Sequence, residues 1–250
     1  MYDLQGHVGV ITGSSRGIGA ATAIAMAKAG AKVVVNYLKN EKAANSVVKT
    51  IVDAGGDAIA VQADVSKPDD VKRLMGVGRN EFGFIDILIN NAYCFPIEDK
   101  SFMETTWEEY ETQFLGVVGS SFFCTKELLP DMKKRKWGRI VNVSSTTIRQ
   151  PEFGFHARAT AKSALTSFTM QLAQELMPCN ITVNVIAPGW TDTDQVAKFM
   201  AMKHSAASKT PGGKIARPEE VADVILALVS PETRILTGAT IPACQGYIMG

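Results

Sequence analysis

The chain has 250 residues, of which 46% are hydrophobic and 20% charged, and its formal net charge is +1. This length and composition can bury one sizeable core, so we expect a single domain over residues 1–250. The near-neutral charge argues against binding to nucleic acid or to a membrane surface. No apolar run reaches the ~18 residues of a membrane span, and the N-terminus lacks the features of a secretion signal, so we expect a cytoplasmic protein.

The cysteines and histidines predict no metal site. The four cysteines form no Cys-x-x-Cys pair, and no histidine lies at metal-ligand spacing from them. We therefore expect reduced thiols and no bound metal.

A glycine-rich turn lies near the N-terminus. Residues 8–19 read V-G-V-I-T-G-S-S-R-G-I-G, and apolar residues at helical spacing follow. Glycines let the backbone turn and let a phosphate approach without a Cβ in the way, and free N–H groups at a helix start favour an anion. This strand, turn and helix predict a dinucleotide site.

Apolar runs and amphipathic stretches then alternate along the chain. Further strands are expected at Lys32–Asn36, Ala58–Gln62, Ile85–Ile89, Gly138–Val143, Ile181–Ile186 and Ile235–Ala243. Helices are expected at Glu41–Ala54, Ser66–Phe82, Thr106–Lys134, Arg158–Met177 and Pro218–Leu228. This alternation predicts a doubly wound α/β fold, in which helices cover both faces of a seven-stranded parallel sheet.

One irregular region covers residues 191–217. A stretch of this length between a strand and a helix predicts a lid over the substrate. Its Met200 and Met202 either line an adaptable apolar pocket or belong to a helix that packs on its neighbours.

Several motifs occur in a specific order. They are Thr12-Gly13-x-x-x-Gly17-x-Gly19, Ala63-Asp64-Val65, Asn90-Asn91-Ala92, Val143-Ser144-Ser145, Lys162, and Ala187-Pro188-Gly189 followed by Thr193. With them the chain resembles the short-chain dehydrogenase/reductase family from Gly6 to Met249, particularly the 3-oxoacyl-carrier-protein reductase and glucose dehydrogenase-like members. The resemblance implies a Rossmann-like fold with strand order 3-2-1-4-5-6-7. It also implies a homo-oligomer, a dimer or tetramer built through the long helix, the Lys162 helix and the last strand.

The family's cofactor-binding pattern is complete. The resemblance implies a nicotinamide dinucleotide bound by Gly13, Ser15, Arg16, Gly17, Ile18, Gly19, Asn36, Asp64, Val65, Asn91, Ala92, Lys162, Pro188, Gly189 and Thr193. Relatives that use NAD carry an acid at the end of the second strand, which binds the ribose and repels a 2′-phosphate. Asn36 takes that place here, and Arg16 can meet the phosphate, so we expect NADP(H). The alternative is that Arg16 is only an exposed turn residue.

The family's catalytic pattern is incomplete. Its reductases use Asn, Ser, Tyr and Lys, and the resemblance places Ser145 and Lys162 in two of these roles. The tyrosine should lie four residues before Lys162, where this chain has Arg158. Val117 replaces the asparagine, and Tyr93 replaces a glycine beside the nicotinamide. We therefore expect an atypical active site without the tyrosine acid/base.

Arg158 cannot donate a proton as tyrosine does, because the guanidinium pKa lies above ~12. On a helix, Arg158 and Lys162 are one turn apart, and two neighbouring cations favour an anion close by. That anion is either a group of the substrate or a protein acid such as Glu152, Asp192 or Asp194.

Three functions remain open. The one we favour is an NADP(H)-dependent carbonyl or imine reductase of a small molecule, in which Ser145 and Arg158 polarise the oxygen. The proton would come from water, from Lys162 or from His156, although His156 can equally be a surface residue. The alternatives are a lyase, isomerase or cyclase that keeps the cofactor, and a non-catalytic subunit that assembles with an active relative.

Overall fold

The computed structural model describes residues 2–93, 100–193, 207–208 and 210–248. Seven parallel strands form one sheet in the order β3-β2-β1-β4-β5-β6-β7, which confirms the predicted topology. The strands are β1 (Val8–Ile11), β2 (Lys32–Tyr37), β3 (Ala58–Gln62), β4 (Ile87–Asn90), β5 (Gly138–Val143), β6 (Ile181–Pro188) and β7 (Thr240–Ala243).

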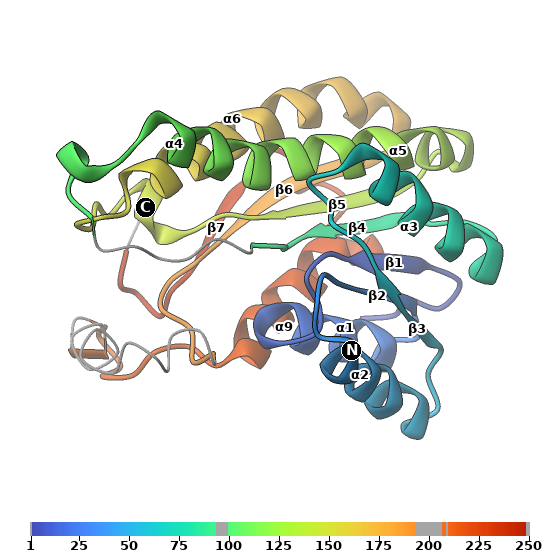
Figure 1. Ribbon diagram of the computed structural model, residues 1–250. Coiled ribbons are helices and arrows are strands. Elements are labelled where there is room, and N and C mark those ends of the chain that lie inside the picture. Colours follow the sequence, from blue (N-terminus) through green and yellow to red (C-terminus); the bar gives the residue numbers. More distant parts are fainter. Residues whose placement is uncertain (1, 94–99, 194–206, 209, 249–250) are drawn as a thin grey trace.

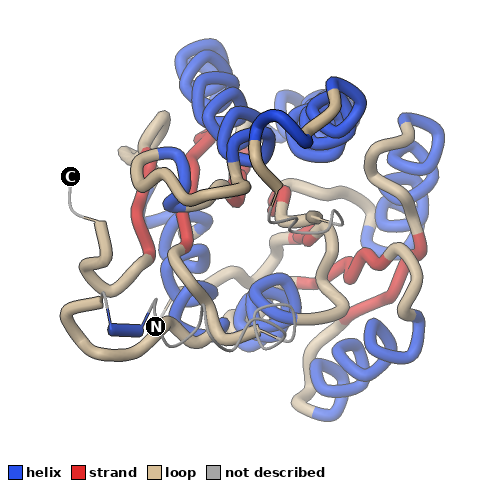
Figure 2. The backbone as a smooth tube through the Cα atoms, turned by 60° about the vertical axis from the view of Figure 1, so that its left-hand side comes forward, coloured by secondary structure: helices blue, strands red, loops and turns tan. Residues whose placement is uncertain are grey.

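Helices cover both faces of this sheet (Figures 1 and 2). One layer holds α1 (Gly17–Lys28), α2 (Glu41–Asp53) and α9 (Pro218–Val229). The other holds α3 (Pro68–Phe82), α4 (Trp107–Phe114), α5 (Ser120–Arg135) and α6 (His156–Leu176). A π-helical segment, Leu115–Gly119, joins α4 to α5. Among the described helices, none is long and apolar enough to cross a membrane.

The strands are apolar on both faces because each face contacts a helix layer. Val33 and Val35 of β2 are fully buried in the core shared with α1, α2 and α9. Val34, between them, is fully buried in the opposite core, shared with α3, α5 and α6. Successive strand residues point to opposite faces, so a parallel sheet between two helix layers needs such a continuous apolar run.

Some predicted boundaries were wrong. The last strand begins at Thr240 rather than Ile235, whose side chain is 86% exposed, and the positive φ of Gly238 lies in the preceding loop. Helix α6 begins at His156, two residues before the predicted start.

The predicted lid at 191–217 lies largely outside the described residues, together with Met200, Met202 and Asp194. Its described ends are joined, because Thr191 forms a parallel bridge with Ala216. The N–H of Asp192 also donates a hydrogen bond to the oxygen of Ala216, at 2.8 Å.

Candidate active site

The glycine turn between β1 and α1 is fixed by the neighbouring strands. The amide of Asn91 donates hydrogen bonds to the backbone oxygens of Thr12 and Gly13, at 2.8 and 3.1 Å. The Thr12 hydroxyl accepts bonds from the N–H groups of Asn91 and Ala92, both at 2.9 Å. Gly13 and Gly17 have φ values of +63° and +57°, a region that favours glycine. The loop after β4 therefore holds the turn in one conformation.

The start of α1 is suited to an anion. Arg16 is its N-cap residue but makes no side-chain capping bond, and the first turn holds no acid. The N–H groups of this turn are therefore left without a side-chain partner, and the helix dipole places partial positive charge there. The side chain of Arg16 is exposed at the same position.

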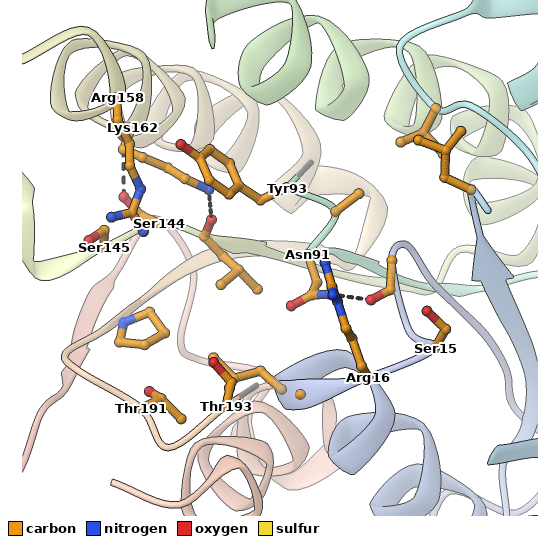
Figure 3. A pocket seen from close by; sticks show the side chains of 18 of the residues that line it. Ser15, Arg16, Asn91, Tyr93, Ser144, Ser145, Arg158, Lys162, Thr191 and Thr193 are labelled. Atoms are coloured by element: carbon orange, nitrogen blue, oxygen red, sulfur yellow. Dashed lines mark hydrogen bonds between the residues drawn. The ribbon is translucent and has the colours of Figure 1, made fainter. Parts of the chain in front are cut away.

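A cavity of about 530 Å³ runs from this turn to α6 (Figure 3). Its walls include nearly all the predicted site residues: Gly13, Ser15, Arg16, Gly17, Ile18, Asn36, Asp64, Val65, Asn91, Ala92, Ser145, Arg158, Lys162, Pro188, Gly189 and Thr193. Gly19 and His156 are not part of its walls. Gly19 has a packing role, because a Cβ there would lie 2.6 Å from the Asn91 amide nitrogen.

Asn36 does not offer a free side chain to the cavity. It is 2% exposed, and its Oδ1 accepts a hydrogen bond from the N–H of Gly13 at 3.0 Å. Its Nδ2 donates to the oxygens of Val61 and Ala63, at 3.3 and 3.1 Å. Asn36 therefore positions the glycine turn, which differs from the ligand role expected from the sequence.

The sequence analysis missed several residues of the cavity wall. They are Leu38, Lys39, Asn40, Thr146, Thr147, Phe155, Trp190 and Thr191. Lys39 and Asn40 follow β2 directly, and their position at the carboxyl end of a strand was a signal for them. Leu38 precedes them at the same strand end. Thr146 and Thr147 lie in a short 3-10 helix, Thr146–Ile148. Phe155, Trp190 and Thr191 lie in loops whose paths depend on tertiary packing.

Lys162 is the most deeply buried cation of the cavity. It is 4% exposed, its ammonium donates a hydrogen bond to the backbone oxygen of Val143, and it lies 5.6 Å from the ring centre of Tyr93. Burial, and to a lesser extent the charge of Arg158, lower the pKa of Lys162 to about 7. Ser145, 6% exposed at the end of β5, lines the same cavity.

Arg158 enters the cavity from α6 beside Lys162 (Figure 3). Its guanidinium lies 5.1 Å from the ring centre of Tyr93 and 5.4 Å from that of Phe155. Burial lowers the pKa of Arg158 from its usual value, and Tyr93 and Glu152 only oppose this shift. Its Nε atom is buried, and no described residue forms a hydrogen bond with it.

Glu152, one of the expected protein counter-ions, does not form an ion pair with Arg158. Glu152 lines the cavity, but its Oε1 accepts a hydrogen bond from the indole nitrogen of Trp190 at 3.2 Å. Asp192 is not part of the cavity wall, and Asp194 lies outside the described residues. Among the residues that the structure describes, none forms an ion pair with Arg158.

His156 lies away from Ser145 and Lys162. It lines a second cavity of about 400 Å³ on the other side of Arg158. Both ring nitrogens have partners, the Thr105 hydroxyl at 3.2 Å and the Tyr110 hydroxyl at 3.1 Å. The ring also stacks on Tyr110. The structure therefore brings His156 close to Arg158 but not to Ser145 or Lys162.

The position expected for the family's asparagine is apolar. Val117 lies in the π-helical segment and is 2% exposed. It packs with Ala161 and Leu165 of α6 and with Tyr93. A π-helical segment inside a helix often marks a functional site, but here its side chain carries no polar group.

The chain is similar to known reductases over nearly its whole length. Residues 12–248 match the family model described as enoyl-(acyl carrier protein) reductase. The chain is 36% identical to the 3-oxoacyl-[acyl-carrier-protein] reductase of Synechocystis, with both chains fully covered. It is 35% identical to the corresponding Aquifex aeolicus enzyme, with 95% of this chain and 96% of that one covered.

Solved structures of reductases share the fold. The promiscuous reductase LugOII of lugdunomycin biosynthesis matches with a TM-score of 0.92 at 32% identity, over 98% of this chain and 99% of that one. A 7α-hydroxysteroid dehydrogenase, solved with NADH and a 7-oxo bile acid, matches with a TM-score of 0.92 at 30% identity, over 98% and 95% of the two chains. The chain therefore belongs to the short-chain dehydrogenase/reductase family of oxidoreductases.

Proposed function

We propose that this protein is an NADP(H)-dependent carbonyl or imine reductase in which Lys162 replaces the family's tyrosine as proton donor. The observation that carries the proposal is the buried Lys162, whose pKa lies at about 7, in one cavity with Ser145 and the glycine turn. An acid with a pKa near the working pH is well suited to proton transfer.

The residues present fit a phosphorylated dinucleotide. The uncapped N-terminus of α1 and the close approach of its glycines suit a pyrophosphate. Arg16 and Lys39 line the cavity and bring positive charge for a 2′-phosphate. Residues 36–40 at the end of β2 include no acid that would repel this phosphate.

The chain's own groups supply the remaining chemistry. A bound reduced nicotinamide supplies the hydride that turns the carbonyl into an alcohol. The Ser145 hydroxyl donates a hydrogen bond to the substrate oxygen, and Arg158 stabilises the negative charge that develops there. The Lys162 ammonium gives one proton to this oxygen, becomes a neutral amine and regains a proton from solvent.

We also propose a homo-oligomer, because apolar side chains gather on the outer helices. Trp107 and Phe114 of α4, Phe122 of α5 and Met170 of α6 are all exposed, Trp107 to 74%. Exposed apolar patches of this kind mark protein interfaces. Light scattering should show a dimer or tetramer, and a monomer would contradict this part of the proposal.

The reductase proposal is tested by the loss of NADPH absorbance with a panel of ketones and cyclic imines. We expect turnover in the wild type, and a loss of at least about a hundredfold in kcat for Lys162→Met. Lys42→Met, on the exposed outer side of α2, is the matched control. Substrate consumption at constant absorbance would support the lyase, isomerase or cyclase alternative, and failure to bind either dinucleotide would support the non-catalytic subunit.

A further inference from the structure

Two hydrogen-bond donors in the cavity have no partner among the residues that the structure describes. The Nε atom of Arg158 is buried and unpaired, and so is the hydroxyl of Thr147, whose residue is 6% exposed. Both residues line the cavity that holds Ser145. Buried polar groups are nearly always hydrogen-bonded, so two unpaired donors in one cavity indicate an acceptor from a ligand.

The charges around these donors indicate which kind of acceptor the ligand provides. Arg158 and Lys162 lie on the same face of α6, and the charge of Arg158 disfavours the charged form of Lys162. The aromatic rings of Tyr93 and Phe155 flank the guanidinium and cannot neutralise it. The charge of Glu152 favours the cation, but Glu152 forms no ion pair with it in the described part of the chain. A buried cation without an ion-pair partner is costly, and a ligand anion would remove this cost.

The guanidinium fork matches a carboxylate better than any neutral acceptor. Arginine binds carboxylates through two parallel N–H···O bonds, which are shorter and stronger than neutral hydrogen bonds. Thr147 lies next to the proposed carbonyl site, because its N–H donates a hydrogen bond to the Ser145 hydroxyl at 3.3 Å. Its own hydroxyl can then donate to an acceptor close to the carbonyl.

We infer that the substrate is an oxo acid, whose carboxylate is held by Arg158 and Thr147 while Ser145 orients the neighbouring carbonyl. This inference rests on the proposed reductase function and adds the substrate class to it. Arg158 thus has a binding role at the position where the family has its proton donor. When the acid is bound, its carboxylate also offsets the repulsion between Arg158 and Lys162.

The test measures binding, so that it does not depend on turnover. Trp190 lines the cavity, and its fluorescence reports ligands there, with Trp190→Phe to assign the signal. The probes are 2-oxobutyrate and 3-oxobutyrate, each compared with its own methyl ester in the presence of NADP⁺. The ester keeps the carbonyl and the carbon skeleton but lacks the negative charge.

We expect at least one acid to bind about tenfold to a hundredfold more tightly than its ester. In Arg158→Met the ratio of the two dissociation constants should fall to about one, because the charge and the fork are both lost. Arg158→Lys keeps the charge and should retain part of the preference, and Thr147→Val should lower it several-fold. Arg149→Met, an exposed arginine outside the cavity, is the matched control and should keep the full ratio.

Three results would overturn the carboxylate site. The wild type binds acid and ester equally, or it binds neither acid, or Arg158→Met keeps the preference for the acid. The reductase proposal can fail separately. If the acids bind preferentially but NADPH is not oxidised, the carboxylate site is supported and the reductase function is contradicted. If uncharged ketones are reduced but no acid is preferred, the reductase function is supported and the carboxylate site is contradicted.

Discussion

Arg158 and Lys162 lie one turn apart on α6, and both side chains enter the cavity that begins at the glycine turn. Burial and this neighbouring charge lower the pKa of Lys162 to about 7. Arg158 therefore stays charged and can bind an anion, whereas Lys162 can exchange a proton near neutral pH. The following predictions depend on these two roles.

The rate of carbonyl reduction should fall as the pH rises through about 7. Lys162 donates a proton only in its ammonium form, and this form is lost above its pKa. In Arg158→Met the falling limb should move to higher pH, because the repulsion that disfavours the ammonium is removed. The measurement is the pH profile of kcat with an uncharged ketone. A limb that stays in place in Arg158→Met would contradict the effect of the Arg158 charge on Lys162.

Protein stability should rise with pH between about 7 and 10 through Lys162. The unfolded chain keeps this lysine protonated up to its ordinary pKa near ~10.4, whereas the folded chain releases the proton at about 7. The unfolded state thus binds more protons in this window, so the free energy of unfolding increases with pH. Urea denaturation should show a flatter pH dependence in Lys162→Met. Parallel curves for the two proteins would contradict the lowered pKa.

Reversing the charge at Arg16 should change the cofactor preference. Arg16→Glu places an acid beside the expected 2′-phosphate, so NADPH binding should weaken by about a hundredfold while NADH binding changes much less. Lys28→Glu makes the same charge change in the last turn of α1 and is the control. Fluorescence titration with both dinucleotides measures the effect. Equal weakening of NADPH and NADH would mean that Arg16 does not contact the 2′-phosphate.

Adding a methyl group at Gly19 should destabilise the glycine turn. In Gly19→Ala the new Cβ would lie 2.6 Å from the Asn91 amide nitrogen and 2.7 Å from the oxygen of Gly13. We expect a loss of about 1–3 kcal/mol in the free energy of unfolding, together with weaker dinucleotide binding. Gly76→Ala, inside α3 with nothing within 4 Å, should instead stabilise the protein by about 0.5–1 kcal/mol. Similar unfolding curves for the two variants would contradict the tight contact.

Local patterns were sufficient to predict the sheet and most of the cavity. Apolar runs such as Lys32–Asn36 identify buried strands, and the carboxyl ends of parallel strands meet at one edge, where the motif residues lie. Helical geometry also explains the position of His156. Two residues along a helix differ by about 200° in direction, so His156 and Arg158 point in different directions. His156 therefore lines only the second cavity, whereas Arg158 lies between the two cavities and lines both.

Other features depend on tertiary contacts that the sequence does not display. The buried hydrogen bonds of Asn36 involve the glycine turn and the end of β3, and no local pattern indicates them. Tertiary packing also buries the Thr147 hydroxyl without a partner among the described residues. It likewise brings the Trp190 indole to the Glu152 carboxylate, where the two form a hydrogen bond. The sequence could therefore indicate that Arg158 needs an anion, but only the packing shows that Glu152 does not pair with it.

The most direct test of the reductase function follows the transferred hydride. The protein is incubated with NADPH that carries deuterium at the transferable C4 position and with 2-oxobutyrate or an uncharged ketone, and the product is analysed by mass spectrometry. We expect an alcohol with one deuterium on the former carbonyl carbon, formed in equal amount to the NADP⁺ released. Substrate converted without deuterium uptake, or with NADPH left intact, would contradict the assignment as a reductase.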